Sequence, residues 1–194
     1  MDLFDSLMAE HRLYEQLLEA LDQCVGMAEQ GPEVPAADLS RFADAIEGFD
    51  RLCHQVKEER ILLPMLVEIG MSADSGMIAA VRVEHEEERE LVQALRKAST
   101  AGDVERIASV GFTLTDHARC HIYTEDTLLF PFARSRLSVP SMDKMTAAAA
   151  AFDHKMLEAG EYAAVAAIRD DLVARYAARP DCIQSRVSWA GTDD

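Results

Sequence analysis

Residues 53–64 read CHQVKEERILLP, and residues 120–131 read CHIYTEDTLLFP. Both segments follow the pattern Cys-His-x-x-x-Glu-acid-x-apolar-Leu-apolar-Pro. Each segment is preceded by a predicted helix whose apolar stripe contains one histidine, His11 in the first case and His85 in the second. The chain therefore uses one helix pair twice, and this repeat predicts a two-fold arrangement of four helices.

The spacing inside each segment indicates a metal site. Residues four apart are neighbours on one face of a helix, so each segment presents an imidazole beside a carboxylate. Imidazole and carboxylate ligands together suit iron, zinc or manganese. A carboxylate can bridge two metal ions, so two glutamates suit a two-metal centre. With one histidine from each remaining helix, six ligands would meet in the bundle core: His11, His54, Glu58, His85, His121 and Glu125.

Helical periodicity extends over most of the chain. Four long helices are expected: 2–28, from 36 to between 64 and 70, from just after 75 to 101, and from about 103 to 132. A break is expected at residues 30–35, which contain Gly and two Pro. The apolar stripe of the fourth helix is expected to be Val110, Leu114, His117, His121, Glu125, Leu128 and Phe132. Polar side chains at core positions are costly unless something satisfies them, and a metal would do so.

The rest of the helical pattern lies beyond Pro140. Two shorter helices are predicted at about 141–159 and 161–178, followed by an irregular tail at 180–194. The domain division is therefore 1–135 for a metal-binding bundle and 136–194 for an extension that packs on it. Pro64 and Pro131 are expected to end or kink their helices, because an interior proline loses a hydrogen bond and clashes with the preceding turn.

The two His-x-x-x-Glu segments with their Leu-x-Pro endings, together with His11 and His85, resemble the hemerythrin or HHE cation-binding family. The resemblance covers about residues 1–135. It implies an all-α, antiparallel, up-down-up-down four-helix bundle, here with additional C-terminal helices. It also implies two non-heme iron ions, oxo- and carboxylate-bridged, on the six residues named above. Respiratory hemerythrins have five histidine ligands, with two on the third helix, whereas this third helix has one.

Several residues near the six leave alternatives open. His117, one turn before His121, is a candidate seventh ligand, a hydrogen-bond donor toward a ligand, or simply a half-buried side chain. Glu88 is expected to be a solvated acid, with a ligand role as the alternative. Glu59 and Asp126 are expected to point away from the site and to influence it only electrostatically. The remaining side chains are assigned to packing or to the surface rather than to chemistry: Tyr14, Tyr123, Cys53 and Cys120 to packing, and His154 with Glu158 to a surface pair.

Composition excludes several classes of function. The formal net charge is −16, and clustered Lys and Arg are missing, so neither a nucleic acid nor an anionic membrane surface is an expected partner. No apolar run reaches the ~18–20 residues of a membrane span. The N-terminal residues lack the cationic and apolar pattern of a secretory signal. The four cysteines form no C-x-x-C pair, and their sparseness predicts a cytoplasmic protein.

A di-iron centre with an open coordination position predicts a protein that binds or senses dioxygen, peroxide or nitric oxide. One alternative is an enzyme that decomposes peroxide in the manner of a catalase. A second alternative is a protein that stores or delivers iron. A third is an interaction protein whose C-terminal helices form the contact surface around a purely structural metal. A homodimer is compatible with each of these.

Overall fold

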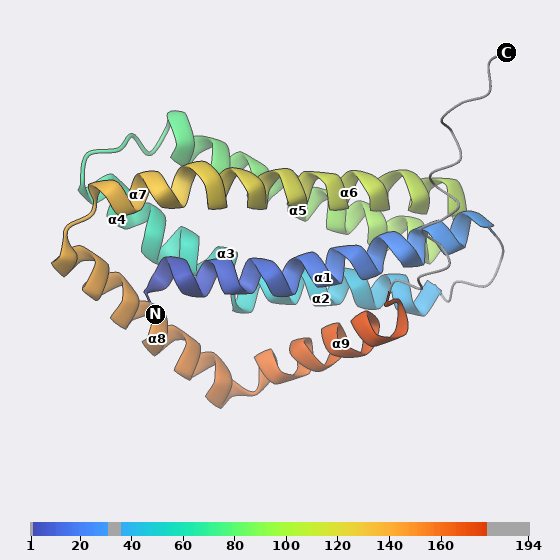
Figure 1. Ribbon diagram of the computed structural model, residues 1–194. Helices are drawn as coiled ribbons and strands as arrows, with labels where there is room; N and C mark the ends of the chain where they lie inside the picture. Colours follow the sequence, from blue (N-terminus) through green and yellow to red (C-terminus); the bar gives the residue numbers. More distant parts are fainter. Residues whose placement is uncertain (1, 31–35, 178–194) are drawn as a thin grey trace, which may run out of the picture.

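The computed structural model describes residues 2–30 and 36–177, and all of its regular elements are helical. Gln30 still belongs to the first helix, whereas residues 31–35 of the expected break and the tail at 180–194 lie outside the described residues. Figure 1 follows the chain through these helices. In chain order they are α1 (Leu3–Gln30), α2 (Ala36–Leu52), α3 (Gln55–Lys57), η1 (Glu58–Leu62), α4 (Leu63–Glu68), α5 (Gly76–Ala101), α6 (Val104–Thr124), η2 (Glu125–Leu129), α7 (Phe130–Arg136), α8 (Val139–Ala159) and α9 (Glu161–Arg175).

The long helices form an antiparallel bundle. The chain runs along α1, returns through α2 to α4, runs along α5, and returns through α6 and α7 (Figure 1). The packed pairs are α5 with α6, α6 with α1, and α2 with α5. The up-down-up-down bundle predicted from the resemblance is confirmed.

Local signals in the sequence explain where two of the long helices begin and end. Gly102 takes the left-handed backbone conformation, with φ of 66°, and ends α5, because glycine adopts that conformation without steric cost. The side chain of Asp103 then accepts a hydrogen bond from the backbone N–H of Arg106 at 3.0 Å and starts α6. The two helices therefore meet in a tight antiparallel turn.

A π-helical turn follows each predicted ligand glutamate. The turns η1 and η2 begin at Glu58 and Glu125, and each is followed within two residues by a proline, Pro64 or Pro131. A proline in a helix clashes with the carbonyl four residues earlier, and a widened turn gives that carbonyl room. The helices therefore continue past both prolines, so of the two predicted outcomes, an end or a kink, the first does not occur at either proline.

The π-turns also shift the buried face. A π-turn holds one residue more than an α-turn, so the buried position after Glu125 moves from Leu128 to Leu129. Leu129 is buried, whereas Leu128 is 59% exposed and was wrongly assigned to the apolar stripe. In the first repeat Leu62 is likewise fully buried, while Ile61 is only partly buried.

The second helix is less regular than the sequence suggested. It stops at Leu52, and His54 has φ −91° and ψ −80°, outside the helical region. The backbone N–H groups of Cys53 and His54 both bond to the carbonyl of Phe49, at 3.0 Å each. The first repeat therefore contains a local break at its histidine, whereas His121 lies within the unbroken α6.

Two apolar clusters fill the bundle, and the predicted ligands lie between them. One cluster contains Leu18, Phe42, Leu95 and Leu114 among its members, and the other contains Phe4, Leu63, Ile78 and Phe130. Along α1 the sequence passes from Leu7 in one cluster, through His11, to Tyr14 in the other. The site is therefore a polar layer closed at both ends by packed hydrophobic side chains, which exclude water from it.

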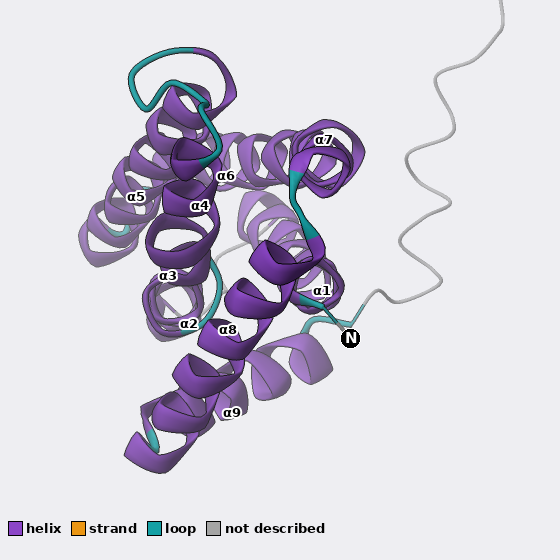
Figure 2. Ribbon diagram, turned by 90° about the vertical axis from the view of Figure 1, so that its left-hand side faces the viewer, coloured by secondary structure: helices purple, strands orange, loops and turns teal. Residues whose placement is uncertain are grey.

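The C-terminal helices α8 and α9 lie against the bundle. Met145 and Ala149 of α8 belong to one apolar cluster, and Leu172 of α9 belongs to the other. Figure 2 shows the bundle from one end. Helix α8 crosses beside α1, and α9 lies behind α8 in this view. No helix in residues 2–30 and 36–177 is long and apolar enough to cross a membrane.

The contact between α2 and α9 includes a glycine that leaves room for a valine. A Cβ atom placed on Gly48 would lie 2.5 Å from Cγ2 of Val165. Gly48→Leu should therefore lower the free energy of unfolding by about 1–3 kcal/mol, as overpacking does, measured by urea denaturation. The double variant Gly48→Leu/Val165→Ala should recover part of this loss. Equal destabilisation of the single and double variants would contradict this packing.

Candidate metal centre

Six of the seven predicted ligands meet in the centre of the bundle. Two groups of side chains each place four possible ligand atoms within 4.8 Å of one another. The first group is His11, His54, Glu58 and Glu125, and the second is Glu58, His85, His121 and Glu125. All six residues are buried, and the two glutamates belong to both groups. The arrangement suits two cations bridged by two carboxylates.

The imidazole Nε2 atoms face the shared carboxylates. Nε2 of His11 lies 3.2 Å from Glu125, and Nε2 of His121 lies 3.4 Å from the same carboxylate. Nε2 of His85 lies 3.2 Å from Glu58, and Nε2 of His54 lies 3.7 Å from it. Each glutamate is therefore approached by imidazoles from more than one helix.

Unpartnered polar atoms at the centre show that these side chains fit a cation. Both carboxylate oxygens of Glu58 and of Glu125, with Nε2 of His85 and of His121, are buried without a hydrogen-bond partner. Among the described residues only Oδ1 of Asp50 shares this condition. Nε2 of His11 also lies 2.9 Å from Nε2 of His54, where two lone pairs repel unless a proton or a cation lies between them. A bound cation would satisfy these groups together.

Four outer carboxylates fix the orientation of the four imidazoles. Each histidine has its Nδ1 atom within hydrogen-bonding distance of one carboxylate, which leaves the Nε2 lone pair facing inward. The pairs are His11 with Asp126 at 2.7 Å, His54 with Glu10 at 3.1 Å, His85 with Glu59 at 2.9 Å, and His121 with Glu84 at 2.7 Å.

The outer carboxylates follow the same repeat as the ligands. Glu10 and Glu84 each precede the lone histidine of their helix, and each accepts from the histidine of the following segment. Glu59 and Asp126 each follow a shared glutamate in the sequence. Because each forms a hydrogen bond with a site histidine, the expectation that they point away from the site is wrong. Sequence reasoning missed Glu10 and Glu84, although the duplicated Glu-His dipeptide, at 10–11 and 84–85, was a signal for them.

A buried lysine makes the two halves of the site unequal. Lys57 is fully buried, and its ammonium group donates to Glu10 and, at 3.1 Å, to Asp153 of α8. The equivalent position in the second segment is Thr124, whose hydroxyl donates to a backbone carbonyl of its own helix. The positive charge of Lys57 therefore lies near one histidine only, and α8 helps to hold it there.

The structure does not bring His117 to the centre. Its ring nitrogen Nε2 donates to the backbone carbonyl of Glu84 at 2.9 Å, because its place on α6 faces α5 rather than the core. It therefore supports the helix that carries one outer carboxylate, and only four histidines take part in the two groups.

Other sequence assignments near the site have mixed outcomes. Glu88 is buried rather than solvated, and it accepts hydrogen bonds from Tyr14 and, at 2.8 Å, from Gln55. Tyr123 is 69% exposed, so its assignment to packing is wrong. His154 and Glu158 form an exposed pair at 3.5 Å, as expected.

Electrostatic shifts in the metal-free protein follow from this network. Burial lowers the pKa of His85, but the nearby carboxylates of Glu58 and Glu59 outweigh that effect and raise it to about 10. The hydrogen bond to His85 lowers the pKa of Glu59 to about 2. Burial opposes charging of His54 as well, yet Glu58 and Glu10 raise its pKa well above the usual value. Without a cation, protons therefore balance the charge of the carboxylates.

An antiparallel helical bundle whose core gathers histidines around two shared glutamates defines a cation-binding bundle protein. The chain belongs to the hemerythrin family: the model of the hemerythrin HHE cation binding domain matches residues 2–133 and, in a second match, residues 76–185. The second match extends across residue 135 into α8 and α9. No curated protein and no solved structure matches the chain.

Cation uptake should release protons. A metal ligand must be a neutral imidazole, whereas the pKa of about 10 keeps His85 protonated at pH 7 in the metal-free protein. The apparent affinity should therefore fall as the pH falls from 8 to 6, by about tenfold per pH unit for each proton displaced. Calorimetric titration of the metal-free protein in two buffers of different ionisation enthalpy measures the protons released. Identical heats in both buffers would contradict the arrangement of charges described above.

Thiol reactivity should separate the two cysteines of the repeat. Burial raises the pKa of Cys53 to about 12, whereas Cys120 is exposed, so its assignment to packing is wrong. In a Cys182→Ser background, Cys120 should react with a thiol reagent at pH 8 at least about a hundredfold faster than Cys53. A Cys120→Ser variant isolates the slow reaction, and fast labelling in that variant would show that Cys53 is accessible.

Proposed function

We propose that this protein is a non-heme di-iron protein that binds or senses a small oxidant or diatomic ligand, namely dioxygen, peroxide or nitric oxide. The observation that carries the proposal is the sharing of Glu58 and Glu125 between the two histidine groups. Two carboxylates common to two sites suit a pair of metal ions held a few ångströms apart, as in other bundle proteins with carboxylate-bridged iron or manganese.

The donor set favours iron over a closed zinc site. Each group offers two imidazoles and a share of two carboxylates, which is four donors. Structural zinc is complete with four donors, whereas iron accepts up to six and keeps positions open for an external ligand. When bound, iron would supply those open positions and the electrons for the reaction with an oxidant.

The residues of this chain prepare the site for that role. When the imidazoles are neutral, the outer carboxylates keep the proton of each ring on Nδ1, so the Nε2 lone pairs face inward and can coordinate a metal. The ring of Phe130 stacks on His11, and that of Phe49 stacks on His54, which restricts the rotation of both imidazoles. The apolar clusters on both sides limit the access of water. A small ligand would therefore meet a preorganised and largely dry centre.

Peroxide decomposition is the second candidate function. Because His117 bonds to the Glu84 carbonyl, only four histidines belong to the two groups, and fewer ligands leave more open positions on the metals. More open positions favour redox turnover over reversible binding. The two functions use the same residues and differ in whether the centre turns over.

The test is to load metal-free protein with ferrous iron under anaerobic conditions and then to add dioxygen, nitric oxide or hydrogen peroxide separately. We expect about two irons per chain and a change of near-ultraviolet and visible absorption with at least one of the three. A single spectral change per addition supports binding or sensing, and sustained dioxygen evolution from peroxide supports the enzyme. Protein that holds zinc alone, with no spectral response, would contradict both.

Variants of the predicted metal ligands test which residues hold the iron. His54→Ala and His121→Ala should each lower the iron content to half or less, because each removes a donor from one group. His117→Ala is the matched control on α6, and it should keep both irons. Unchanged iron in His54→Ala and His121→Ala would exclude these residues as ligands.

A further inference from the structure

The two histidine–glutamate groups differ at one outer carboxylate. In the group that contains His54 (the His54 group), that imidazole bonds to Glu10, and in the group that contains His121 (the His121 group), it bonds to Glu84. Glu10 is paired with the fully buried ammonium group of Lys57. Glu84 is 30% exposed and has no lysine or arginine partner within the described part of the chain. A buried positive charge therefore lies beside one group only.

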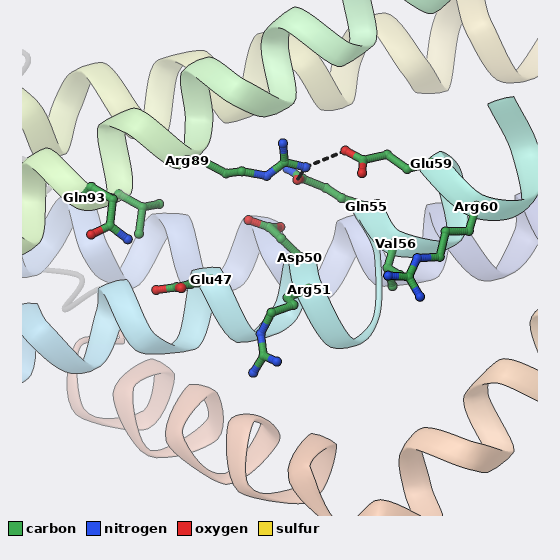
Figure 3. Close-up of a pocket in the computed structure, with 10 residues that line it drawn as sticks. Glu47, Asp50, Arg51, Gln55, Val56, Glu59, Arg60, Arg89 and Gln93 are labelled. Carbon is green, nitrogen blue, oxygen red and sulfur yellow. Dashed lines mark hydrogen bonds and ion pairs between the residues drawn. The ribbon is translucent and has the colours of Figure 1, made fainter.

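The other outer carboxylate is alike in the two groups. Figure 3 shows Arg89 of α5 reaching Glu59, and Arg12 of α1 pairs with Asp126 in the other group. The two arginine side chains are 43% and 53% exposed, so solvent screens both charges to a similar extent. Among the cations that contact the outer carboxylates, Lys57 is therefore the one that distinguishes the groups.

The hydrogen bonds of the imidazoles differ in the direction that this charge predicts. Nδ1 of His54 lies 3.1 Å from Glu10, whereas Nδ1 of His121 lies 2.7 Å from Glu84. Because Lys57 occupies the other oxygen of Glu10, that carboxylate accepts less strongly from His54. Nε2 of His54 is also the farthest of the four from the nearest shared carboxylate, at 3.7 Å. A weaker bond at Nδ1 makes an imidazole a weaker metal ligand.

We propose that Lys57 makes the His54 group the weaker of two cation positions, so that the His121 group fills first and the His54 group holds its cation more loosely. Lys57 is a positioning residue that acts through Glu10 on His54, and its charge also repels a cation held by that imidazole, because a buried charge is poorly screened. The inference rests on the proposed two-metal centre and adds an order of loading to it.

Helix α8 influences how strongly Lys57 acts. Asp153 of α8 accepts from the ammonium group at 3.1 Å, and its side chain is 40% exposed, so solvent screens part of its compensating charge. Nearby on the same helix, the hydroxyl of Thr146 accepts from the backbone N–H of Leu3 at 3.2 Å and so ties α8 to the start of α1. Through Asp153, the C-terminal extension therefore tunes the affinity of the weaker position.

The test is calorimetric and optical titration of the metal-free, full-length protein with cobalt(II) at one fixed pH. Cobalt(II) is next to iron(II) in the affinity order of divalent metals, and the titration involves no oxidant. We expect two binding steps whose dissociation constants differ at least about tenfold. Two equal steps would overturn the inference and leave the two-metal centre intact, whereas fewer than two cobalt ions per chain would contradict both.

Ligand variants assign the two steps. His54→Ala should keep the tight step and lose the weak one, and His121→Ala should lose the tight step and keep the weak one. Retention of the tight step in both variants would show two equivalent positions that repel each other, and it would also overturn the inference.

Substitutions at Lys57 and Asp153 should act in opposite directions, which a merely structural role would not produce. Lys57→Met should tighten the weak step about tenfold, because Glu10 then acts on His54 without competition from an ammonium group. Asp153→Asn should weaken the same step, because the ammonium charge loses its compensation. Lys144→Met removes an exposed lysine of the same helix and is the matched control, which should leave both steps unchanged.

Either variant can overturn the assignment. An unchanged or weaker second step in Lys57→Met, with a normal helical circular dichroism spectrum, would show that the lysine does not set the difference. Asp153→Asn changes a partly exposed position, so it tests the inference even where Lys57→Met is too unstable to titrate. A tighter or unchanged weak step in Asp153→Asn would contradict the role assigned to the ammonium group.

Discussion

Two carboxylates, those of Glu58 and Glu125, lie at the centre of the bundle with none of their oxygen atoms hydrogen-bonded. Leaving an ionised carboxylate in an apolar interior without a partner costs several kcal/mol or more. Four imidazoles surround the pair, and four further carboxylates orient those imidazoles from outside. The hydrophobic clusters on both sides of this layer are compatible with it only because the charges are balanced within the layer. A cation, or in its absence protons, is the necessary remaining partner.

The backbone adapts to the same requirement. The π-turns begin at the two glutamates themselves. In proteins generally, π-turns are frequently found at functional sites. Each turn gives the following proline room and moves the next buried position by one residue. The repeat is not perfectly symmetric, however, because Lys57 brings a buried positive charge and a contact with α8 to one half only. The two histidine–glutamate groups therefore differ in their electrostatic surroundings, although their residue types are alike.

The sequence predicted the helical bundle because the apolar stripes were regular and because the two His-x-x-x-Glu segments repeated one unit. It also predicted which six residues meet, since spacing alone places His54 beside Glu58 and His121 beside Glu125. The exposure of Leu128 was not predicted, because it depends on a π-turn that simple periodicity does not include. The burial of Glu88 and the position of His117 were not predicted either. Both depend on how α5 and α6 are rotated against each other, which is a tertiary property.

Anomalous diffraction from crystals of iron-loaded protein can show whether two metal ions share Glu58 and Glu125. Data collected on both sides of the iron absorption edge identify the metal and its position. This arrangement predicts two iron peaks about 3.5–4 Å apart, each between two imidazoles and both in contact with the two glutamates. A single peak, two peaks that share neither glutamate, or no peak within the histidine–glutamate layer would contradict it.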